Sequence, residues 1–177
     1  MKLQRGFVPA VILESILALL ACSCGHGGES APVAPVIGAL TPDRGAGRVQ
    51  AFKLSVTDAG GAAQVYDVQV MFSESLQDVK NACWIDFNNQ TGTMAARNEE
   101  GTDWLPSVGA GSSDTVANTN CSVAARDVKV ENKGNESSVT FTVSFAPVFK
   151  GLKNVMVIAS APHAHSGWQG RGTWTVN

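Results

Sequence analysis

The sequence predicts an all-β fold, an antiparallel sandwich of two sheets, and three observations support this prediction. Apolar and polar residues alternate at every second position in several short segments, which is the period of a β-strand. Stretches rich in Gly, Asn, Asp and Ser separate these segments at short intervals. The chain also lacks the regular succession of strands and long helices that a parallel sheet requires. We therefore expect one sandwich domain over residues 36–177, with a closed barrel as the second choice.

The individual strands follow from this period of two. The alternation is clearest in AFKLSVTD (51–58), VYDVQVMF (65–72) and SSVTFTVSF (137–145). Turn-forming residues fill TPDRGAG, DAGGAA, NNQTG, GAGSS and ENKGNESS between the strands. Further strands are expected near residues 36–40, 82–87, 92–96, 120–130, 153–159 and 172–176. No internal repeat is visible, so the pattern predicts a single unit.

The first 21 residues have the layout of a secretory signal peptide. Lys2 and Arg5 precede an apolar stretch of about 16 residues that ends in small side chains. A transmembrane helix needs roughly 20 apolar residues, and this stretch is shorter and contains Pro9 and Glu14. The alternative is a buried N-terminal helix. We expect that residues 1–21 are removed and that the remaining chain is exported.

The residues that follow the apolar stretch predict a lipid anchor at Cys22. Leu19-Leu20-Ala21-Cys22 resembles the lipobox of bacterial lipoproteins, in which cleavage leaves an N-terminal cysteine that carries acyl chains. The protein would then be held on the extracytoplasmic side of a membrane or at the cell surface. Two alternatives remain, secretion without an anchor and a metal site. A metal site is disfavoured because Cys22, Cys24 and His26 supply only three of the four ligands that tetrahedral zinc requires. No other role for Cys24 is evident.

Residues 22–35 form a predicted flexible tether, because GHGGESAPVAPV is half Gly, Ser and Pro and has almost nothing able to build a core. The whole chain has 13 basic and 15 acidic residues. Removal of residues 1–21 takes away Lys2, Arg5 and Glu14, which leaves 11 basic and 14 acidic residues, a net charge of −3. No basic stripe is present, so a nucleic-acid partner is not expected.

Cys83 and Cys121 are the other two cysteines of the chain, and each adjoins a predicted strand. In an exported protein such a pair usually forms a disulfide. The alternative is two buried free thiols.

Several segments of the domain resemble immunoglobulin-like or fibronectin-like sandwich domains of exported bacterial proteins. The similarity lies in VQVMF, NACWIDF, GTDWLPSVGAGSS with NTNCSV, VTFTVSFAPVFKGLKNVMVIAS, and SGWQGRGTWTV, and covers most of residues 36–177. SGWQGRGTW and the cysteine pair are its most specific parts. The resemblance implies a β-sandwich, a disulfide between Cys83 and Cys121 and an extracytoplasmic setting. It implies no enzymatic activity.

We expect no catalytic residue, metal or cofactor. Related domains often carry an acidic calcium-binding loop after the second strand, but here only Ala, Gly, Gln, Val and Tyr separate Asp58 from Asp67. His163 and His165 would point to one side of an extended chain, yet no third metal ligand is evident, and a solvated loop is expected. Serine occurs without the G-x-S-x-G motif of a nucleophile.

The four tryptophans divide into two pairs. Trp84 is expected to pack on the disulfide inside the sandwich, and Trp174 is expected in the core as part of the last strand. Polar and turn-forming residues flank Trp104 and Trp168, which makes them candidate ligand contacts. Exposed tryptophans stack on sugar rings or anchor protein partners. The alternative is that Trp104 and Trp168 cap the ends of the sandwich.

These observations predict an exported, lipid-anchored envelope protein with a structural, adhesion or protein-contact role. The alternative is a carbohydrate-binding surface lipoprotein that uses exposed tryptophans, and a hydrolase is a third class. The partners would be the membrane, through the lipid, and envelope proteins or polysaccharide. Exposure of Trp104 and Trp168 on one face would favour carbohydrate binding. A deep cleft with convergent carboxylates or histidines would favour a hydrolase.

Overall fold

The computed structural model describes residues 32–75, 77 and 79–177. The predicted signal peptide (residues 1–21), the predicted lipid site at Cys22, and Cys24 and His26 lie outside the described residues. Of the predicted tether, only residues 32–35 are described. The first strand begins at Val36.

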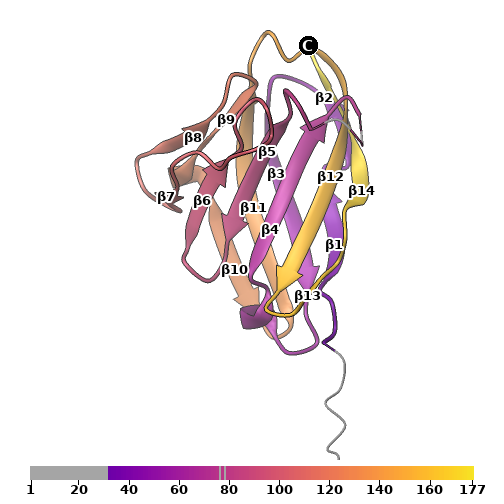
Figure 1. The fold of residues 1–177 in the computed structure, drawn as a ribbon, viewed down its shortest axis with the longest axis vertical. Helices are drawn as coiled ribbons and strands as arrows, with labels where there is room; N and C mark the ends of the chain where they lie inside the picture. Colours follow the sequence, from indigo (N-terminus) through magenta and orange to yellow (C-terminus); the bar gives the residue numbers. More distant parts are fainter. Residues whose placement is uncertain (1–31, 76, 78) are drawn as a thin grey trace, which may run out of the picture. The chain divides into compact units, whose positions relative to one another are not determined.

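The described chain forms two β-sheets that pack face to face, which confirms the predicted two-sheet sandwich (Figure 1). The strands are β1 (Val36–Thr41), β2 (Arg44–Ala46), β3 (Val49–Thr57), β4 (Asp67–Ser73), β5 (Cys83–Asn88), β6 (Thr93–Ala96), β7 (Val108–Gly109), β8 (Thr115–Ala117), β9 (Cys121–Ala124), β10 (Lys129–Lys133), β11 (Glu136–Phe145), β12 (Gly151–Ala161), β13 (Ala164–His165) and β14 (Gln169–Val176). Two short 3-10 helices, η1 (Ala62–Gln64) and η2 (Ala125–Asp127), lie between strands.

The smaller sheet has six strands and the larger has eight. The smaller has the order β1-β3-β11-β9-β8, and β10 also pairs with β11. The larger has the order β2-β14-β12-β4-β5-β6-β7, and β13 also pairs with β12. The paired strands run antiparallel, except that β2 and β14 run parallel. Strands β4, β5 and β12 thus occupy the middle of the larger sheet.

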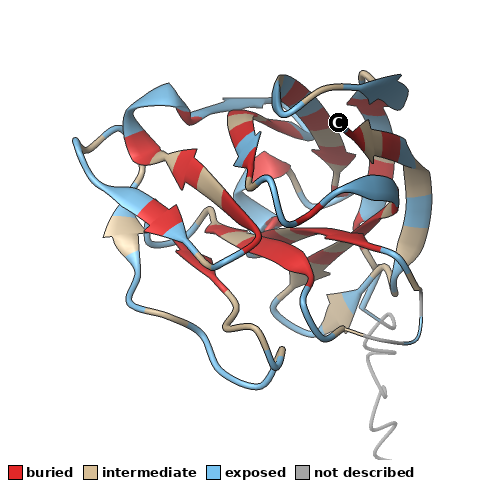
Figure 2. Cartoon of the chain, turned by 90° about the horizontal axis from the view of Figure 1, so that it is seen from above, coloured by how far each residue is buried: buried red, intermediate tan, exposed pale blue. Residues whose placement is uncertain are grey.

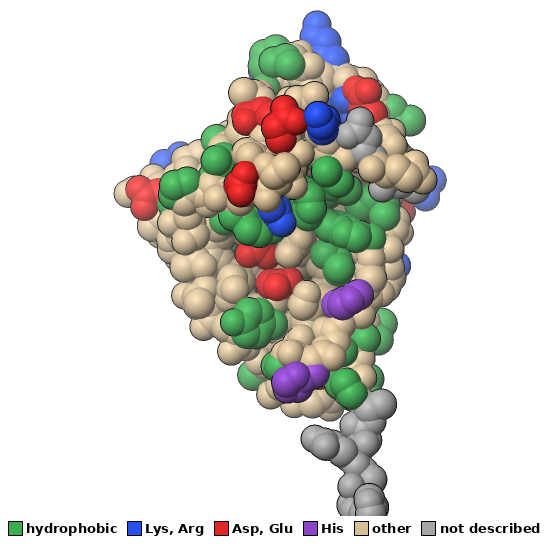
Figure 3. All heavy atoms as spheres, viewed as in Figure 1, with side chains coloured by type: hydrophobic (Ala, Val, Ile, Leu, Met, Phe, Trp, Pro, Cys, Tyr) green, Lys and Arg blue, Asp and Glu red, His purple; other side chains and the backbone are tan. Residues whose placement is uncertain are grey.

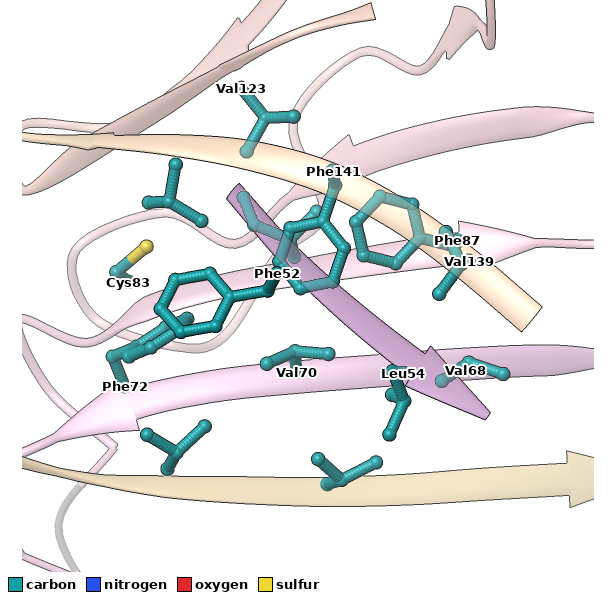
Figure 4. Packing of buried hydrophobic residues seen from close by; sticks show 14 of the residues in the cluster. Phe52, Leu54, Val68, Val70, Phe72, Cys83, Phe87, Val123, Val139 and Phe141 are labelled. Atoms are coloured by element: carbon teal, nitrogen blue, oxygen red, sulfur yellow. The ribbon is translucent and has the colours of Figure 1, made fainter. Parts of the chain in front are cut away.

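The hydrophobic core lies between the two sheets, because alternate residues of each strand point inward. Figure 2 shows the buried residues concentrated between the layers. At the centre, Phe52 of β3 has its ring centroid 5.2 Å from that of Phe72 and 5.8 Å from that of Phe141 (Figure 4). Trp174 completes this group at 5.3 Å from Phe52 and is 3% exposed, as expected for a core residue.

Cys83 and Cys121 join the two sheets within this core. Cys83 begins β5 of the larger sheet and Cys121 begins β9 of the smaller sheet. Their sulfur atoms lie 2.00 Å apart, which is the distance of a disulfide bond, and both residues are buried. The predicted pairing of these cysteines therefore agrees with the structure.

The expectation of one strand over residues 120–130 is wrong. The chain instead forms β9, the turn of helix η2 and then β10. Both strands pair with the same edge of β11, where β9 contacts Val143–Phe145 and β10 contacts Glu136–Thr140. Helix η2 lets the chain bend between these two contacts.

The segment ENKGNESS was expected to be a turn, but much of it is paired. Strand β10 extends to Lys133 and β11 begins at Glu136, so the turn itself is short. All five residues of β10 are exposed. A strand with no buried position lacks the apolar alternation by which a strand is recognised in a sequence.

Candidate functional site

The outer face of the larger sheet carries the candidate site, and strand register determines which side chains meet there. In β5, Cys83, Ile85 and Phe87 point into the core, so Trp84 and Asp86 point outward. Trp84 pairs with Met71 of β4, which in turn pairs with Met156 of β12. Together with Ala82, these three residues form a small apolar cluster outside the main core.

The expectation that Trp84 packs on the disulfide inside the sandwich is therefore wrong. Successive residues of a strand point to opposite faces of the sheet. Because Cys83 faces inward, Trp84 must face outward. Its indole is nevertheless only 9% exposed, because other side chains of the outer face cover it.

Trp104 and Trp168 are the side chains that flank Trp84. The ring centroid of Trp104 lies 5.8 Å from that of Trp84, and the centroid of Trp168 lies 5.4 Å from it, both in edge-to-face geometry. Trp104 lies in the segment after β6, where it forms a β-bridge with Arg97, and Trp168 immediately precedes β14. Each is 38% exposed. The structure thus brings the two predicted contact residues together on one face.

Figure 3 shows this face, with hydrophobic side chains gathered over β4, β5 and β12 and charged side chains beside them. Gln69 of β4 accepts a hydrogen bond from the indole Nε1 of Trp84 at 3.1 Å. This bond satisfies the buried indole donor and determines the orientation of the central ring.

Arg97 connects the aromatic residues to the polar part of the face. Its guanidinium carbon lies 4.2 Å from the ring centroid of Trp104 and 4.9 Å from that of Trp84, which is the geometry of a cation–π contact. Its Nη1 donates a hydrogen bond to the carbonyl oxygen of Thr102 at 2.7 Å. The two indole rings and the carbonyl oxygen of Thr102 therefore fix the position of the Arg97 guanidinium.

Two carboxylates, Asp67 and Asp86, lie beside this aromatic cluster. Asp86 pairs with Gln69 across the sheet, and Asp67 lies two residues before Gln69 on the same strand. One side-chain oxygen of each aspartate is buried and has no hydrogen-bond partner, and the same holds for the Nε of Arg97. These three atoms are buried, but the side chains that carry them are part-exposed, so polar groups adjoin the indoles on this face.

Burial shifts the acidity of both aspartates. Removal from solvent raises the pKa of Asp86 to about 7, with repulsion from Asp67 adding to the rise and attraction to Arg97 opposing it. Burial also raises the pKa of Asp67, whereas a hydrogen bond with Ser160 lowers it. Near pH 7 Asp86 is therefore present both as a carboxylate, which only accepts hydrogen bonds, and as a carboxylic acid, which can also donate one.

We predict that stability falls with rising pH because of Asp86. The pKa of Asp86 in the folded state exceeds the unfolded value of about 3.9, so the folded state binds this proton more tightly than the unfolded state does. The resulting contribution to the free energy of unfolding is complete below about pH 4 and is lost as the pH rises through 7. Between pH 5 and 8, the free energy of unfolding should decrease by about 2 kcal/mol more in the wild type than in Asp86→Asn. Urea unfolding over this pH range measures the difference. Asp127→Asn, at an exposed carboxylate, should follow the wild type; equal slopes for all three proteins would contradict the prediction.

His163, His165 and Asp58 lie elsewhere. His163 is exposed in the β12–β13 turn, and His165 is exposed in β13, where its Nδ1 accepts the backbone N–H of Gly167 at 3.1 Å. Asp58 follows β3 of the smaller sheet and accepts the backbone N–H of Gly60, whereas Asp67 belongs to β4 of the larger sheet. Over residues 32–177, apart from 76 and 78, no group of three or more His, Cys, Asp or Glu residues is arranged to hold a metal ion.

Comparison with models of known protein families and with curated protein sequences finds no match to this chain. The part of the chain that the structure describes contains no helix with the length and hydropathy of a membrane span.

Asp86, Gln69 and Arg97 were not singled out in the sequence, and Asp67 was considered there only with Asp58 for a calcium-binding loop. A signal for Asp86 was present, because it lies two residues after Trp84 and therefore shares its face. This spacing places Asp86 on the outer face only once Cys83, Ile85 and Phe87 are known to point into the core. Arg97 follows the last residue of β6, and its place over the indoles depends on the path of the loop that carries Trp104.

Proposed function

We propose that this protein binds carbohydrate on the outer face of the larger sheet, as an exported envelope protein anchored by a lipid at Cys22. The observation that carries the proposal is the meeting of Trp104 and Trp168, both part-exposed, on one face with the part-exposed carboxylates of Asp67 and Asp86. Export and the anchor rest on the sequence of residues 1–22. The resemblance to immunoglobulin-like domains supports an extracytoplasmic binding module.

The chemistry of a sugar matches both parts of this face. One side of a pyranose ring presents C–H groups that pack against an indole, and its edge presents hydroxyl groups. The part-exposed carboxylates of Asp67 and Asp86 can accept hydrogen bonds from these hydroxyls, and the guanidinium of Arg97 can donate to a ring or hydroxyl oxygen. A purely apolar ligand would cover the part-exposed side chains of Asp67, Asp86 and Arg97 without offering hydrogen bonds, at a cost of about 1–3 kcal/mol for each polar group left unpaired. The combination therefore favours a polyhydroxylated ligand over a lipid.

A structural, adhesion or protein-contact role is the second candidate, and the Trp–Arg cluster is the observation that favours it. Tryptophan and arginine are enriched at the energetic centres of protein interfaces. Arg97 packed against Trp84 and Trp104 has the composition of such a centre. A protein ligand would also satisfy the aspartates with backbone or side-chain donors. Carbohydrate binding is the better-supported candidate because it uses the exposed rings of both Trp104 and Trp168 together with the adjacent carboxylates.

Binding to polysaccharides tests the proposal. A soluble form of residues 32–177 is mixed with insoluble cellulose, chitin and peptidoglycan, and titrated with their soluble oligosaccharides while tryptophan fluorescence is followed. We expect binding to at least one of them, with Trp104→Ala and Trp168→Ala each weakening it about tenfold or more. Fluorescence should shift on binding because the responding indoles lie in the site.

The matched control is Val49→Ala, which shortens an exposed side chain on the smaller sheet. It should bind as the wild type does. The carbohydrate proposal is refuted if no polysaccharide binds, or if both tryptophan variants bind with wild-type affinity while remaining folded. The first of these results would leave protein contact as the function to pursue.

A further inference from the structure

A cavity of about 350 Å³ lies between the two sheets. It is separate from the outer face of the larger sheet that carries Trp84, Trp104 and Trp168, here called the tryptophan face. Leu54 and Val139 line it from the smaller sheet, and Val68 and Phe87 line it from the larger sheet. Each of these side chains is at most 5% exposed. Phe87 also contacts Phe141 at 4.8 Å between ring centroids, which places the cavity directly beside the packed core (Figure 4).

Small residues leave this space open at its mouth. Gly92, Ala110 and Gly111 line the cavity, and a Cβ atom added at either glycine would meet no other atom within 4 Å. Both glycines have backbone φ in the left-handed region, 65° at Gly92 and 82° at Gly111, where other residues are strained. The turns at this end therefore hold two residues without side chains, which leaves open space at the mouth of the cavity.

The lining of the cavity is apolar with a neutral polar rim. Among the described residues that line it, none is ionisable, and the polar ones are Asn88, Asn89, Thr93, Asn132 and Ser137. Nδ2 of Asn89 donates to the carbonyl oxygen of Val65 at 3.0 Å, and Nδ2 of Asn132 donates to Oδ1 of Asn89 at 3.3 Å. These bonds position amide groups at the opening. An ionised ligand would lose its hydration without gaining an opposite charge.

We propose that this cavity binds a neutral small molecule that has an apolar body and a single hydrogen-bonding end. The body would lie against Leu54, Val68 and Phe87, and the polar end would meet the amides of Asn88 or Asn132. An apolar cavity of about 150 Å³ takes up benzene, so this one suits a guest of roughly 10 to 15 non-hydrogen atoms. Apolar walls with a few placed polar groups are typical of small-molecule sites.

A matched pair of probes tests both the site and its neutrality. 2-Naphthalenemethanol and 2-naphthoate share one apolar body, and only the second is charged at pH 7. Isothermal titration calorimetry of residues 32–177 should show binding of the alcohol with a dissociation constant on the order of 1–100 µM. The carboxylate should bind at least tenfold more weakly.

Variants locate the binding within the cavity. Ala110→Phe places a large side chain at the mouth and should abolish binding, whereas Ala117→Phe, on β8 outside the cavity, should leave it unchanged. Should Ala110→Phe fail to fold, Val130→Ser provides the test, because Val130 lines the mouth and is 40% exposed. This variant should weaken binding about fivefold.

A naphthalene ring could also stack on the tryptophan face, so Trp104→Ala belongs in the same series. It should bind the alcohol with unchanged affinity. The proposal is overturned if the alcohol does not bind, if the carboxylate binds equally well, or if Trp104→Ala removes binding while the Val130→Ser variant keeps it. Polysaccharide binding is measured separately, so either site can fail without the other.

Discussion

Replacing Cys83 and Cys121 together by alanine should lower the midpoint of thermal unfolding of this protein by roughly 10–15 °C. The disulfide closes a chain segment over a sequence separation of 38 residues. In the chain-entropy model, cross-linking a segment of this length stabilises the folded state by about 4 kcal/mol relative to the unfolded state. The cross-link also joins β5 of one sheet to β9 of the other, so its loss removes a covalent tie between the layers.

Differential scanning calorimetry of residues 32–177 measures this effect without interference from Cys22 or Cys24. The control is wild-type protein treated with a reducing agent, which breaks the cross-link but leaves both sulfur atoms in the core. Reduction should reproduce most of the decrease, and the double variant should not respond to the reducing agent. Equal midpoints for oxidised and reduced wild type would show that the cross-link contributes no stability.

Trp84→Ala should decrease the free energy of unfolding by about 3–5 kcal/mol and also abolish the proposed carbohydrate binding on the outer face. Trp84 is 91% buried although it lies outside the main core, because Met71, Met156 and the two flanking indoles surround it. Truncation would leave a void where these groups meet and would leave Gln69 without its indole donor. Trp104 and Trp168 would lose the ring that holds them in position.

Urea unfolding and oligosaccharide titration of the same variants separate the two effects of Trp84. Trp84→Phe keeps an aromatic ring but not the indole N–H, so it should lose only about 1–2 kcal/mol and retain weakened binding. Trp104→Ala should lose binding while decreasing stability by less than Trp84→Ala, because Trp104 is 38% exposed. If Trp84→Ala and Trp104→Ala were equally stable, Trp84 would not be the structural centre of the face.

The long strands were predictable because each has a buried face. Phe52, Leu54 and Val56 occur at every second position of β3, and their exposure is 0–1%. The same period predicted β4 and β11 within two residues of their ends. Strands β2, β7, β8 and β13 contain only two or three residues each, which is too short for an alternation to be recognised.

The candidate site was predictable only in part. The polar surroundings of Trp104 and Trp168 in the sequence marked them as candidate contacts, and each is 38% exposed. Trp84 was placed on the wrong side of its sheet because its neighbour Cys83 suggested a shared location, although adjacent strand residues face opposite ways. Whether Asp86 titrates near neutral pH depends on burial and on Asp67, both of which arise only when β4 and β5 pair.

The sequence by itself determined the long strands with a buried face, which of their residues point inward, and which cysteines were suited to pair within the domain. It also predicts the signal peptide and the lipid at Cys22. The tertiary structure alone decided that three tryptophans and Arg97 meet, since they come from separate strands and loops. The alternation of apolar and polar residues within one strand reflects the burial of one face of that strand. The meeting of the tryptophans and Arg97 depends instead on the register between strands and on the paths of the loops, which the packing of the whole sandwich determines.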